Sequence, residues 1–205
     1  MTNLHFTNDV SALILTGGKS SRMGTNKALL PLGEVNTITK IVEIAKTYCD
    51  QVVLSTNEPE VYDFLNLPCV KDIYMEKGPL GGLHSGLTCI DTKQALVFPC
   101  DLPLISSEYI QPLLEEEPQY DIVIYEADGR IHPLFGRYNK NVLPRIVTCL
   151  EENRLKIQEF FQPLQVKILK AEDYNFSVLP KIGFTNMNTN ADYEMVKSIL
   201  VNKEV

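Results

Sequence analysis

The sequence predicts one α/β domain built on an open, mostly parallel sheet, with helices on both faces and a small antiparallel excursion. Short apolar runs alternate with amphipathic helical patterns through the first half of the chain, and Gly, Pro or Asp follows most of the runs. A strand, a helix and a second strand in succession give parallel neighbours joined by a right-handed crossover. Residues 1–205 contain no low-complexity linker and no internal repeat, so we expect a single domain.

The first half of the chain is expected to supply four parallel strands. Apolar residues recur at i, i+3, i+4 and i+7 between residues 38 and 49, which predicts an amphipathic helix there. The other elements follow from apolar runs that end at turn residues. The expected strands are 10–15, 51–56, 69–70 and 95–100, and the other expected helices are 58–65, 80–90 and 106–116.

The second half is less regular. Residues 121–126 and 133–138 flank a turn at Asp128-Gly129, a hairpin signal, so they are the expected antiparallel excursion. Two helical stretches, 139–151 and 156–161, and a strand at 166–169 are expected next. Thr189, with Asp192 three residues on, forms the pair that caps the start of a helix, and the last helix follows.

Composition excludes several classes of protein. The net charge of −7 and the pI near 5.0 describe an acidic surface that repels polyanions, so we expect no nucleic acid partner. No apolar run is long enough to cross a membrane, and the first residues lack the features of a signal peptide, which predicts a cytoplasmic protein. The five cysteines form no Cys-x-x-Cys pair and are expected to be reduced thiols in the core; the three histidines lack zinc-ligand spacing.

The strongest functional signal is the glycine-rich segment at residues 15–27, LTGGKSSRMGTNK, directly after the first strand. Glycines let backbone N–H groups approach a phosphate, and Lys19, Arg22 and Lys27 supply positive charge. The spacing fits neither the Walker loop nor the dinucleotide-binding pattern. The alternative is a surface loop that is glycine-rich without a ligand.

Polar residues follow the other expected strands, at the edge where ligands bind to open parallel sheets. Asp101 comes directly after the strand at 95–100, where it is placed to hold Mg²⁺ against a triphosphate; the alternative is a turn or cap aspartate. Asp72 and the segment 55–57 are expected at the same edge, where their side chains are suited to contact a base or a ribose. The alternative is that they are ordinary loop residues. The segment 78–82, GPLGG, opens a helix whose amides face an anion or a base, or is a tight packing turn.

The roles of three residues in the second half of the chain likewise have two interpretations each. His132 precedes Pro133 after the hairpin turn, and a lone histidine there is either a surface group or a ligand contact. Asn186 and Asn188 flank Met187, so in an extended segment both asparagine side chains face the same side. They are a ligand-facing pair or simply the approach to the last helix.

Taken together, these segments resemble the molybdenum cofactor guanylyltransferases, within the Rossmann-like nucleotidyltransferases. The family shows a double-glycine loop, Gly-Pro-Leu-x-Gly, Pro-Cys-Asp-x-Pro, a later His-Pro and Asn-x-Asn-Thr. In this chain the matches are residues 15–27, 78–82, 99–103, 132–133 and 186–189, in the same order and over nearly the whole chain. Thr16 stands where alanine is commoner, Asn26 where an acidic residue or proline is frequent, and Ser55 where some members have asparagine.

The resemblance implies a nucleotide-diphospho-sugar transferase-like fold and transfer of GMP from GTP to the terminal phosphate of molybdenum-molybdopterin, with release of pyrophosphate. Mg²⁺ is the implied cofactor. The implied catalytic residues are Lys27, Arg22 and Asp101. The implied nucleotide contacts are Leu15, Thr16, Gly17, Gly18, Lys27, Asp72, Gly82 and Asp101. The implied metal ligands are Asp101 and Asn188, and the implied acceptor contacts are His132, Asn186 and Asn188.

Two other readings stay open. One is a CTP-dependent cytidylyltransferase that acts on the molybdenum cofactor or on another phosphorylated acceptor. The other is a nucleotide-binding regulatory protein without turnover. The expected partners are GTP and a molybdopterin-type acceptor, with transient protein partners in cofactor delivery, and neither nucleic acid nor a membrane.

Overall fold

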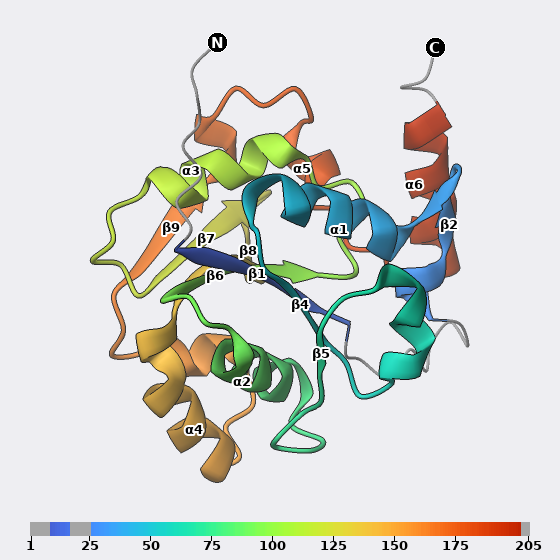
Figure 1. Ribbon diagram of the computed structural model, residues 1–205. Coiled ribbons are helices and arrows are strands. Elements are labelled where there is room, and N and C mark those ends of the chain that lie inside the picture. The colour runs from blue at the N-terminus through green and yellow to red at the C-terminus, as the bar shows by residue number, and fades with distance from the viewer. Residues whose placement is uncertain (1–8, 17–25, 202–205) are drawn as a thin grey trace.

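The chain folds around a central seven-stranded sheet, seen in a computed structural model that describes residues 9–16 and 26–201 (Figure 1). Its strands are β1 (Val10–Leu15), β4 (Val52–Ser55), β5 (Cys69–Val70), β6 (Gln94–Pro99), β7 (Ile122–Ala127), β8 (Arg130–Asn139) and β9 (Val166–Lys170). The strand order is β5-β4-β1-β6-β8-β7-β9, and β8 is the strand that runs against its neighbours β6 and β7. A separate two-stranded ribbon pairs β2 (Pro31–Leu32) with β3 (Val35–Asn36).

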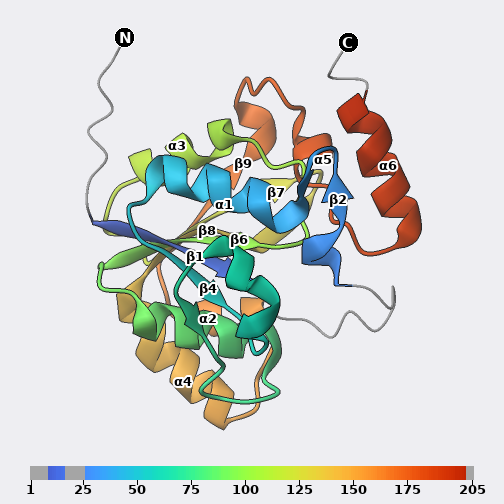
Figure 2. The same cartoon turned by 45° about the vertical axis from the view of Figure 1, so that its right-hand side comes forward.

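Helices cover both faces of this sheet (Figures 1 and 2). One face carries α1 (Thr37–Tyr48) and α3 (Ile110–Glu115), and the other carries α2 (Gly78–Cys89) and α4 (Leu143–Glu151). The short α5 (Pro180–Gly183) lies on the α3 side, and α6 (Asn190–Val201) stands beside the β2–β3 ribbon. The 3-10 helices are Lys27–Leu29, Pro59–Leu65, Ser107–Tyr109, Lys140–Val142, Ile157–Phe161 and Ala171–Asp173.

The two helical layers explain why the strands read as continuous apolar runs. In β1, Ala12 and Ile14 pack in the core on the α1 side, whereas Leu13 and Leu15 pack in the core on the α2 side. Alternate side chains of a strand point to opposite faces, so a strand covered on both faces needs apolar residues at every position. The predicted α/β fold with a mostly parallel sheet is therefore confirmed.

The expected antiparallel pair is confirmed as β7 and β8, although β8 begins at Arg130 rather than at residue 133. Both strands lie within the main sheet, between β6 and β9. β8 pairs with β6 along one edge and with β7 along the other. The hairpin turn was readable from the sequence, but the pairing with β6 is a long-range contact that no local pattern encodes.

Other differences are local. The segment 58–65 forms a 3-10 helix that starts at Pro59 rather than an α-helix, and the β2–β3 ribbon was not predicted. Cys69 and Cys89 are exposed, so the expectation that the cysteines fill the core is wrong for these two. The predicted capping pair is confirmed, because the Asp192 N–H donates to Thr189 Oγ1 (3.2 Å) and the Thr189 N–H donates to Asp192 Oδ2 (2.7 Å).

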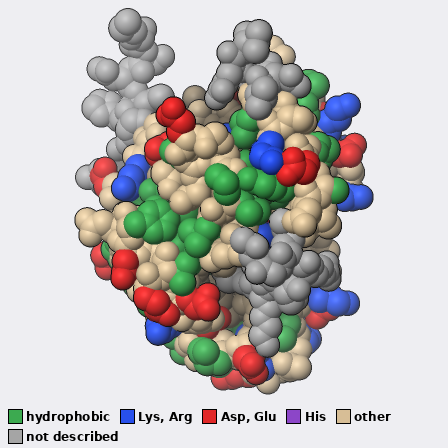
Figure 3. Space-filling view, turned by 90° about the vertical axis from the view of Figure 1, so that its right-hand side faces the viewer, with side chains coloured by type: hydrophobic (Ala, Val, Ile, Leu, Met, Phe, Trp, Pro, Cys, Tyr) green, Lys and Arg blue, Asp and Glu red, His purple; other side chains and the backbone are tan. Residues whose placement is uncertain are grey.

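The surface agrees with the acidic composition. On the face that carries α6 and the β2–β3 ribbon, the coloured Lys and Arg side chains are separated by acidic and hydrophobic ones (Figure 3). The described residues of that face therefore form no continuous basic surface for a polyanion. Among the residues that the structure describes, no helix is long and apolar enough to span a bilayer.

Candidate functional site

Four parallel strands end at the same edge of the sheet, and each is followed by a residue singled out in the sequence. Thr16 follows β1, Ser55 ends β4, Asp72 lies two residues beyond β5, and Asp101 lies two residues beyond β6. β5, β4, β1 and β6 are consecutive neighbours in the sheet, so these side chains line one edge. Of the other predicted residues, Gly17, Gly18 and Arg22 lie outside the described part of the chain.

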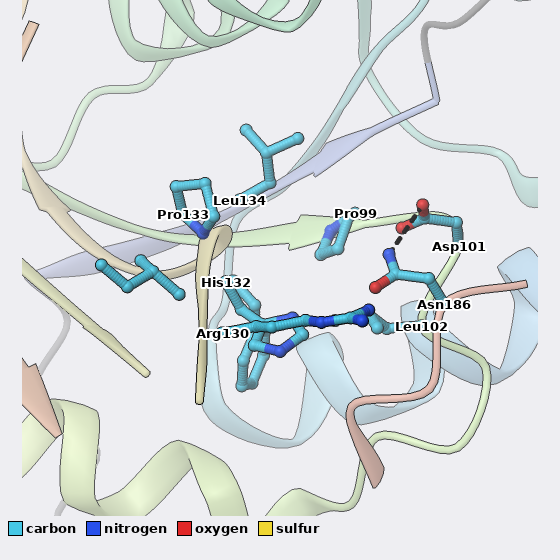
Figure 4. A pocket seen from close by; sticks show the side chains of 10 residues that line it. Pro99, Asp101, Leu102, Arg130, His132, Pro133, Leu134 and Asn186 are labelled. Carbon is cyan, nitrogen blue, oxygen red and sulfur yellow. Dashed lines mark hydrogen bonds between the residues drawn. The ribbon is translucent and has the colours of Figure 1, made fainter. Parts of the chain in front are cut away.

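Lys27 and Asp101 meet at this edge through the two asparagines that precede α6. Lys27 Nζ donates to Asn188 Oδ1 (2.8 Å), and Asn186 Nδ2 donates to Asp101 Oδ2 (3.0 Å; Figure 4). The intervening Met187 is fully buried, and its N–H donates to the Asp101 carbonyl oxygen (2.8 Å). A cation and a carboxylate that are 74 residues apart are therefore held in one site by a three-residue segment.

The start of α6 fixes the asparagine pair. Asp192 Oδ2 accepts hydrogen bonds from the backbone N–H groups of Asn188 (2.9 Å) and Thr189 (2.7 Å). Burial alone would raise the pKa of Asp192, but these N–H donors and the Thr189 hydroxyl outweigh it and hold the pKa below 3.8. The carboxylate stays ionised, so the helix start keeps Asn188 beside Lys27.

The donor set around Asp101 fits a magnesium ion shared with a nucleotide. Asp101 is half-buried, and its Oδ1 accepts no hydrogen bond from the described residues. Those residues contain no group of three or more His, Cys, Asp or Glu side chains that would enclose a metal. Mg²⁺ commonly binds one or two carboxylates and completes its coordination with water and substrate phosphates. Asn188 Oδ1 already accepts from Lys27 and keeps one lone pair, so its role as a ligand stays a prediction.

The thiol of Cys100, next to Asp101, lies in surroundings that favour its protonated form. Burial raises the pKa of the Cys100 thiol to about 12, and the negative charge of Asp101 acts in the same direction. The positive charge of Lys27 opposes this rise without overcoming it. A thiol in that state is protonated at neutral pH.

A second group of predicted residues converges between β1, β4 and the start of α2. A Cβ built on Gly82 would lie 2.9 Å from Ser55 Oγ and 3.6 Å from both Asp72 Oδ1 and Leu15 Cδ2. Ser55 Oγ donates to the Gly82 carbonyl oxygen (3.2 Å), which ties α2 to β4. Gly82 therefore lets the start of α2 pack closely against Ser55 and lie beside the Asp72 carboxylate.

Asn57 orients this carboxylate. Asn57 Nδ2 donates to Asp72 Oδ2, and the Asp72 N–H donates to Asn57 Oδ1, both at 3.0 Å. The other carboxylate oxygen, Oδ1, accepts no hydrogen bond from the described residues and can accept from donors on a base edge. Asn57 thus fixes the orientation of the Asp72 carboxylate.

Tyr62 was not singled out in the sequence, yet its phenol joins the two described ends of the glycine-rich segment. Asn26 Nδ2 donates to Tyr62 Oη (2.9 Å), and the phenol also hydrogen-bonds the Thr16 hydroxyl. The Thr16 hydroxyl donates to the Ser55 carbonyl oxygen (3.0 Å), which ties the end of β1 to β4. Asn26 in turn caps the 3-10 helix that begins with Lys27, because Asn26 Oδ1 accepts from the Ala28 N–H (3.1 Å).

Next to Asp101 the sheet opens into a cavity of about 220 Å³ (Figure 4). β8 pairs with β7 at Gly136 and again at His132, so residues 133–135 form a bulge without partners on β7. The pairing of β8 with β6 also stops at Gly136. The bulge therefore separates the strands, and Pro133 and Leu134 form one wall of the cavity opposite Pro99 and Asp101.

His132 lines this cavity in its neutral form. Burial lowers its pKa below 6.5, and the charge of Arg130 acts in the same direction. A hydrogen bond with the Ala127 backbone and the charge of Asp101 oppose this shift. Its ring packs against Phe184, with centroids 4.7 Å apart. Of the three predicted acceptor residues, His132 and Asn186 thus line the cavity beside Asp101, and Asn188 lines a neighbouring cavity of about 360 Å³.

Comparison with known proteins gives consistent matches. The family model of the MobA-like NTP transferase domain matches residues 12–167. A probable molybdenum cofactor guanylyltransferase from Carboxydothermus hydrogenoformans is 36% identical over 196 residues, covering 96% of this chain and 99% of that protein. One with the same name from Clostridium perfringens is also 36% identical, over 90% of this chain and 94% of that protein.

A solved structure shares the fold. The structure of molybdopterin-guanine dinucleotide biosynthesis protein A from Archaeoglobus fulgidus superposes with a TM-score of 0.80 at 21% identity. The match covers 94% of this chain and 99% of that chain. At this identity the likeness concerns the fold, and it extends over both the parallel and the antiparallel parts of the sheet.

Proposed function

The chain belongs to the family of MobA-like NTP transferase domains, and we propose that it transfers GMP from GTP to the terminal phosphate of a molybdopterin acceptor. Relatives that match this chain at 30–36% identity over most of its length are named guanylyltransferases. The observation that carries the proposal is the meeting of Lys27 and Asp101 at one sheet edge, through Asn188 and Asn186.

The reaction requires positioning and charge neutralisation more than proton transfer. An oxygen of the acceptor phosphate forms a bond to the α-phosphorus of GTP, and the bond from that phosphorus to the β-phosphate oxygen breaks, so that pyrophosphate leaves. The attacking phosphate is already ionised at neutral pH, and no protein base is needed. Two anions must approach each other, which makes cations and fixed dipoles the main catalytic groups.

Lys27 and Asp101 neutralise charge in different ways. Lys27 binds the triphosphate and stabilises the charge that develops on the leaving pyrophosphate, and Asn188 holds its ammonium group in place. Asp101 holds Mg²⁺ through its uncommitted oxygen, while Asn186 fixes the orientation of the carboxylate. When bound, Mg²⁺ neutralises charge on the phosphate oxygens. Arg22, Gly17 and Gly18 are proposed as further phosphate contacts on the resemblance alone.

The base binds beside Leu15, Asp72 and Gly82, which lie close together at the nucleotide edge. Guanine presents two neighbouring donors, N1–H and the 2-amino group, which match a carboxylate acceptor. Cytosine has only its 4-amino donor on the corresponding edge. The carboxylate of Asp72, oriented by Asn57, therefore favours guanine over cytosine. Thr16 contributes its backbone at the end of β1.

The acceptor lies on the other side of Asp101, in the cavity lined by His132 and Asn186. A neutral His132 donates or accepts a hydrogen bond without repelling Arg130. We also propose a cytoplasmic reaction, because GTP and Mg²⁺ are abundant there and all five cysteines are free thiols.

Pyrophosphate release tests the proposal. The purified protein, given GTP, Mg²⁺ and molybdopterin, is expected to release pyrophosphate and form the guanine dinucleotide, and to do neither when CTP or ATP replaces GTP. Turnover with CTP and not GTP would instead identify a cytidylyltransferase. Tight GTP binding without pyrophosphate release would identify a nucleotide-binding protein without turnover.

A further inference from the structure

Two cavities meet beside Asp101 and share part of their lining. The smaller, of about 220 Å³, and the larger, of about 360 Å³, both include Arg130, His132 and Asn186 in their walls. Together they reach the size of a typical small-ligand site. Arg130 is therefore placed at the junction, with Asp101 on the side of the smaller cavity and Lys181 on the side of the larger one.

These two cations have no carboxylate partner in the described part of the chain. Arg130 and Lys181 are both exposed, and neither takes part in an ion pair among residues 9–16 and 26–201. Asp192, which lines the same cavity, instead accepts the N–H groups that begin α6. Asp128, at the tip of the β7–β8 hairpin, is the other carboxylate in that wall. Guanidinium and ammonium donors thus line this cavity without forming an ion pair among the described residues.

The backbone at Arg130 is held in place by the hairpin turn that precedes it. It is the first residue of β8, directly after a two-residue turn in which Asp128 and Gly129 both have positive φ (50° and 69°). The Asp128 N–H donates to Glu172 Oε1 (2.7 Å), which fixes the turn from the neighbouring segment. From the end of this turn, the Arg130 side chain extends across the pocket toward Leu102 and Asn186 (Figure 4).

We infer that Arg130 binds the terminal phosphate of the acceptor, a phosphate monoester, and holds it beside Asp101, with Lys181 contributing attraction from the wall of the larger cavity. The inference rests on the proposed function, because that reaction brings a phosphate monoester to this place. The planar guanidinium offers paired donors that match two phosphate oxygens. It also offsets the repulsion between the acceptor phosphate and the triphosphate, which no other described side chain in the smaller cavity does.

Binding and turnover of molybdopterin with the full chain test the inference. Arg130→Gln is expected to raise the Kd of molybdopterin, measured by pterin fluorescence without nucleotide, by about tenfold or more, the factor of one lost charge-assisted hydrogen bond. The KM for molybdopterin rises by a similar factor. Arg130→Lys, which keeps the charge without the fork, restores part of the loss, and Lys181→Gln has a smaller effect of about two- to threefold. The Kd of Mg-GTP, measured by calorimetry, stays within about twofold of wild type in all three.

Two matched variants separate a local contact from net charge. Lys46→Gln removes one positive charge from the last turn of α1, at the opposite edge of the sheet, and leaves both affinities unchanged. Asp128→Asn removes a negative charge from the cavity wall and keeps a residue that tolerates positive φ, so it is expected to tighten molybdopterin binding about twofold.

The outcomes separate this inference from the proposed function. Turnover with an unchanged Kd and KM for molybdopterin in Arg130→Gln overturns the phosphate site and leaves the transferase intact. Parallel losses of GTP and molybdopterin affinity overturn it too, because Arg130 would then serve the triphosphate. A third outcome is that the wild-type protein binds molybdopterin without turnover and that Arg130→Gln weakens this binding. That outcome supports the phosphate site and contradicts the proposed reaction.

Discussion

Replacing Tyr62 by phenylalanine removes one hydroxyl group and leaves the aromatic ring packed in the core, where the side chain is 2% exposed. Two hydrogen bonds are lost, one to Asn26 and one to Thr16. At about 0.5–1.5 kcal/mol each, the free energy of unfolding is expected to fall by about 1–3 kcal/mol. For a chain of this size that corresponds to roughly 2–12 °C in Tm.

Tyr62→Phe is also expected to weaken the binding of Mg-GTP. The phenol joins the end of β1 to the 3-10 helix that carries Lys27, so its loss loosens the position of the Lys27 ammonium group relative to the nucleotide. The Kd of Mg-GTP is expected to rise about three- to tenfold, equivalent to about 0.7–1.4 kcal/mol, whereas the Kd of guanosine changes less. Calorimetric titrations of both ligands measure this difference.

Tyr48→Phe is the matched control. The Tyr48 hydroxyl donates to the Ser107 carbonyl oxygen (2.9 Å) at the end of α1, away from the nucleotide edge. Its removal is expected to lower Tm without changing the affinity for GTP. The reasoning about Tyr62 is refuted if Tyr62→Phe and Tyr48→Phe lower Tm alike and both bind GTP as wild type does.

Three further changes probe separate parts of the site. Gly82→Ala places a Cβ 2.9 Å from Ser55 Oγ, and the overpacking is expected to cost about 1–3 kcal/mol and weaken guanosine binding. Adding Ser55→Ala should recover stability, and a double variant no more stable than Gly82→Ala would contradict the contact. Asp192→Ala removes the carboxylate that accepts from the N–H groups of Asn188 and Thr189, so the free energy of unfolding in urea is expected to fall by about 1 kcal/mol, and an unchanged urea midpoint would argue against that contribution. Burial lowers the pKa of His132, so the unfolded chain binds more protons and stability falls as pH drops below about 6.5. His132→Gln should make that loss between about pH 7 and about pH 5 shallower, and identical slopes for the two proteins would count against a half-buried, neutral His132.

The sequence predicted what local patterns encode. β1 and β6 are continuous apolar runs, and the residues that follow a parallel strand reach a known edge, so Asp101 could be placed from its position alone. Alternation around the buried Met187 likewise placed Asn186 and Asn188 on one side. These predictions depend on periodicity and on the polarity of the strands.

What the sequence did not predict depends on contacts between distant segments. Tyr62 lies in an unremarkable short helix, and only the fold brings its phenol to Thr16 and Asn26. Arg130 follows a recognisable turn, but the cavity that it enters exists because β8 bulges away from β6 and β7. The sequence carries no local signal for that bulge beyond Pro133, which cannot donate to a neighbouring strand.

The sharing of one Mg-triphosphate by Lys27 and Asp101 is the central feature of the proposed site. Calorimetry with Asp101→Asn, which keeps the shape of the side chain and removes its charge, tests this directly. We predict that Mg²⁺ tightens GTP binding to the wild-type chain by at least about tenfold and has little effect on the variant, while both proteins bind guanosine equally. An undiminished effect of Mg²⁺ on GTP binding to Asp101→Asn would contradict the account.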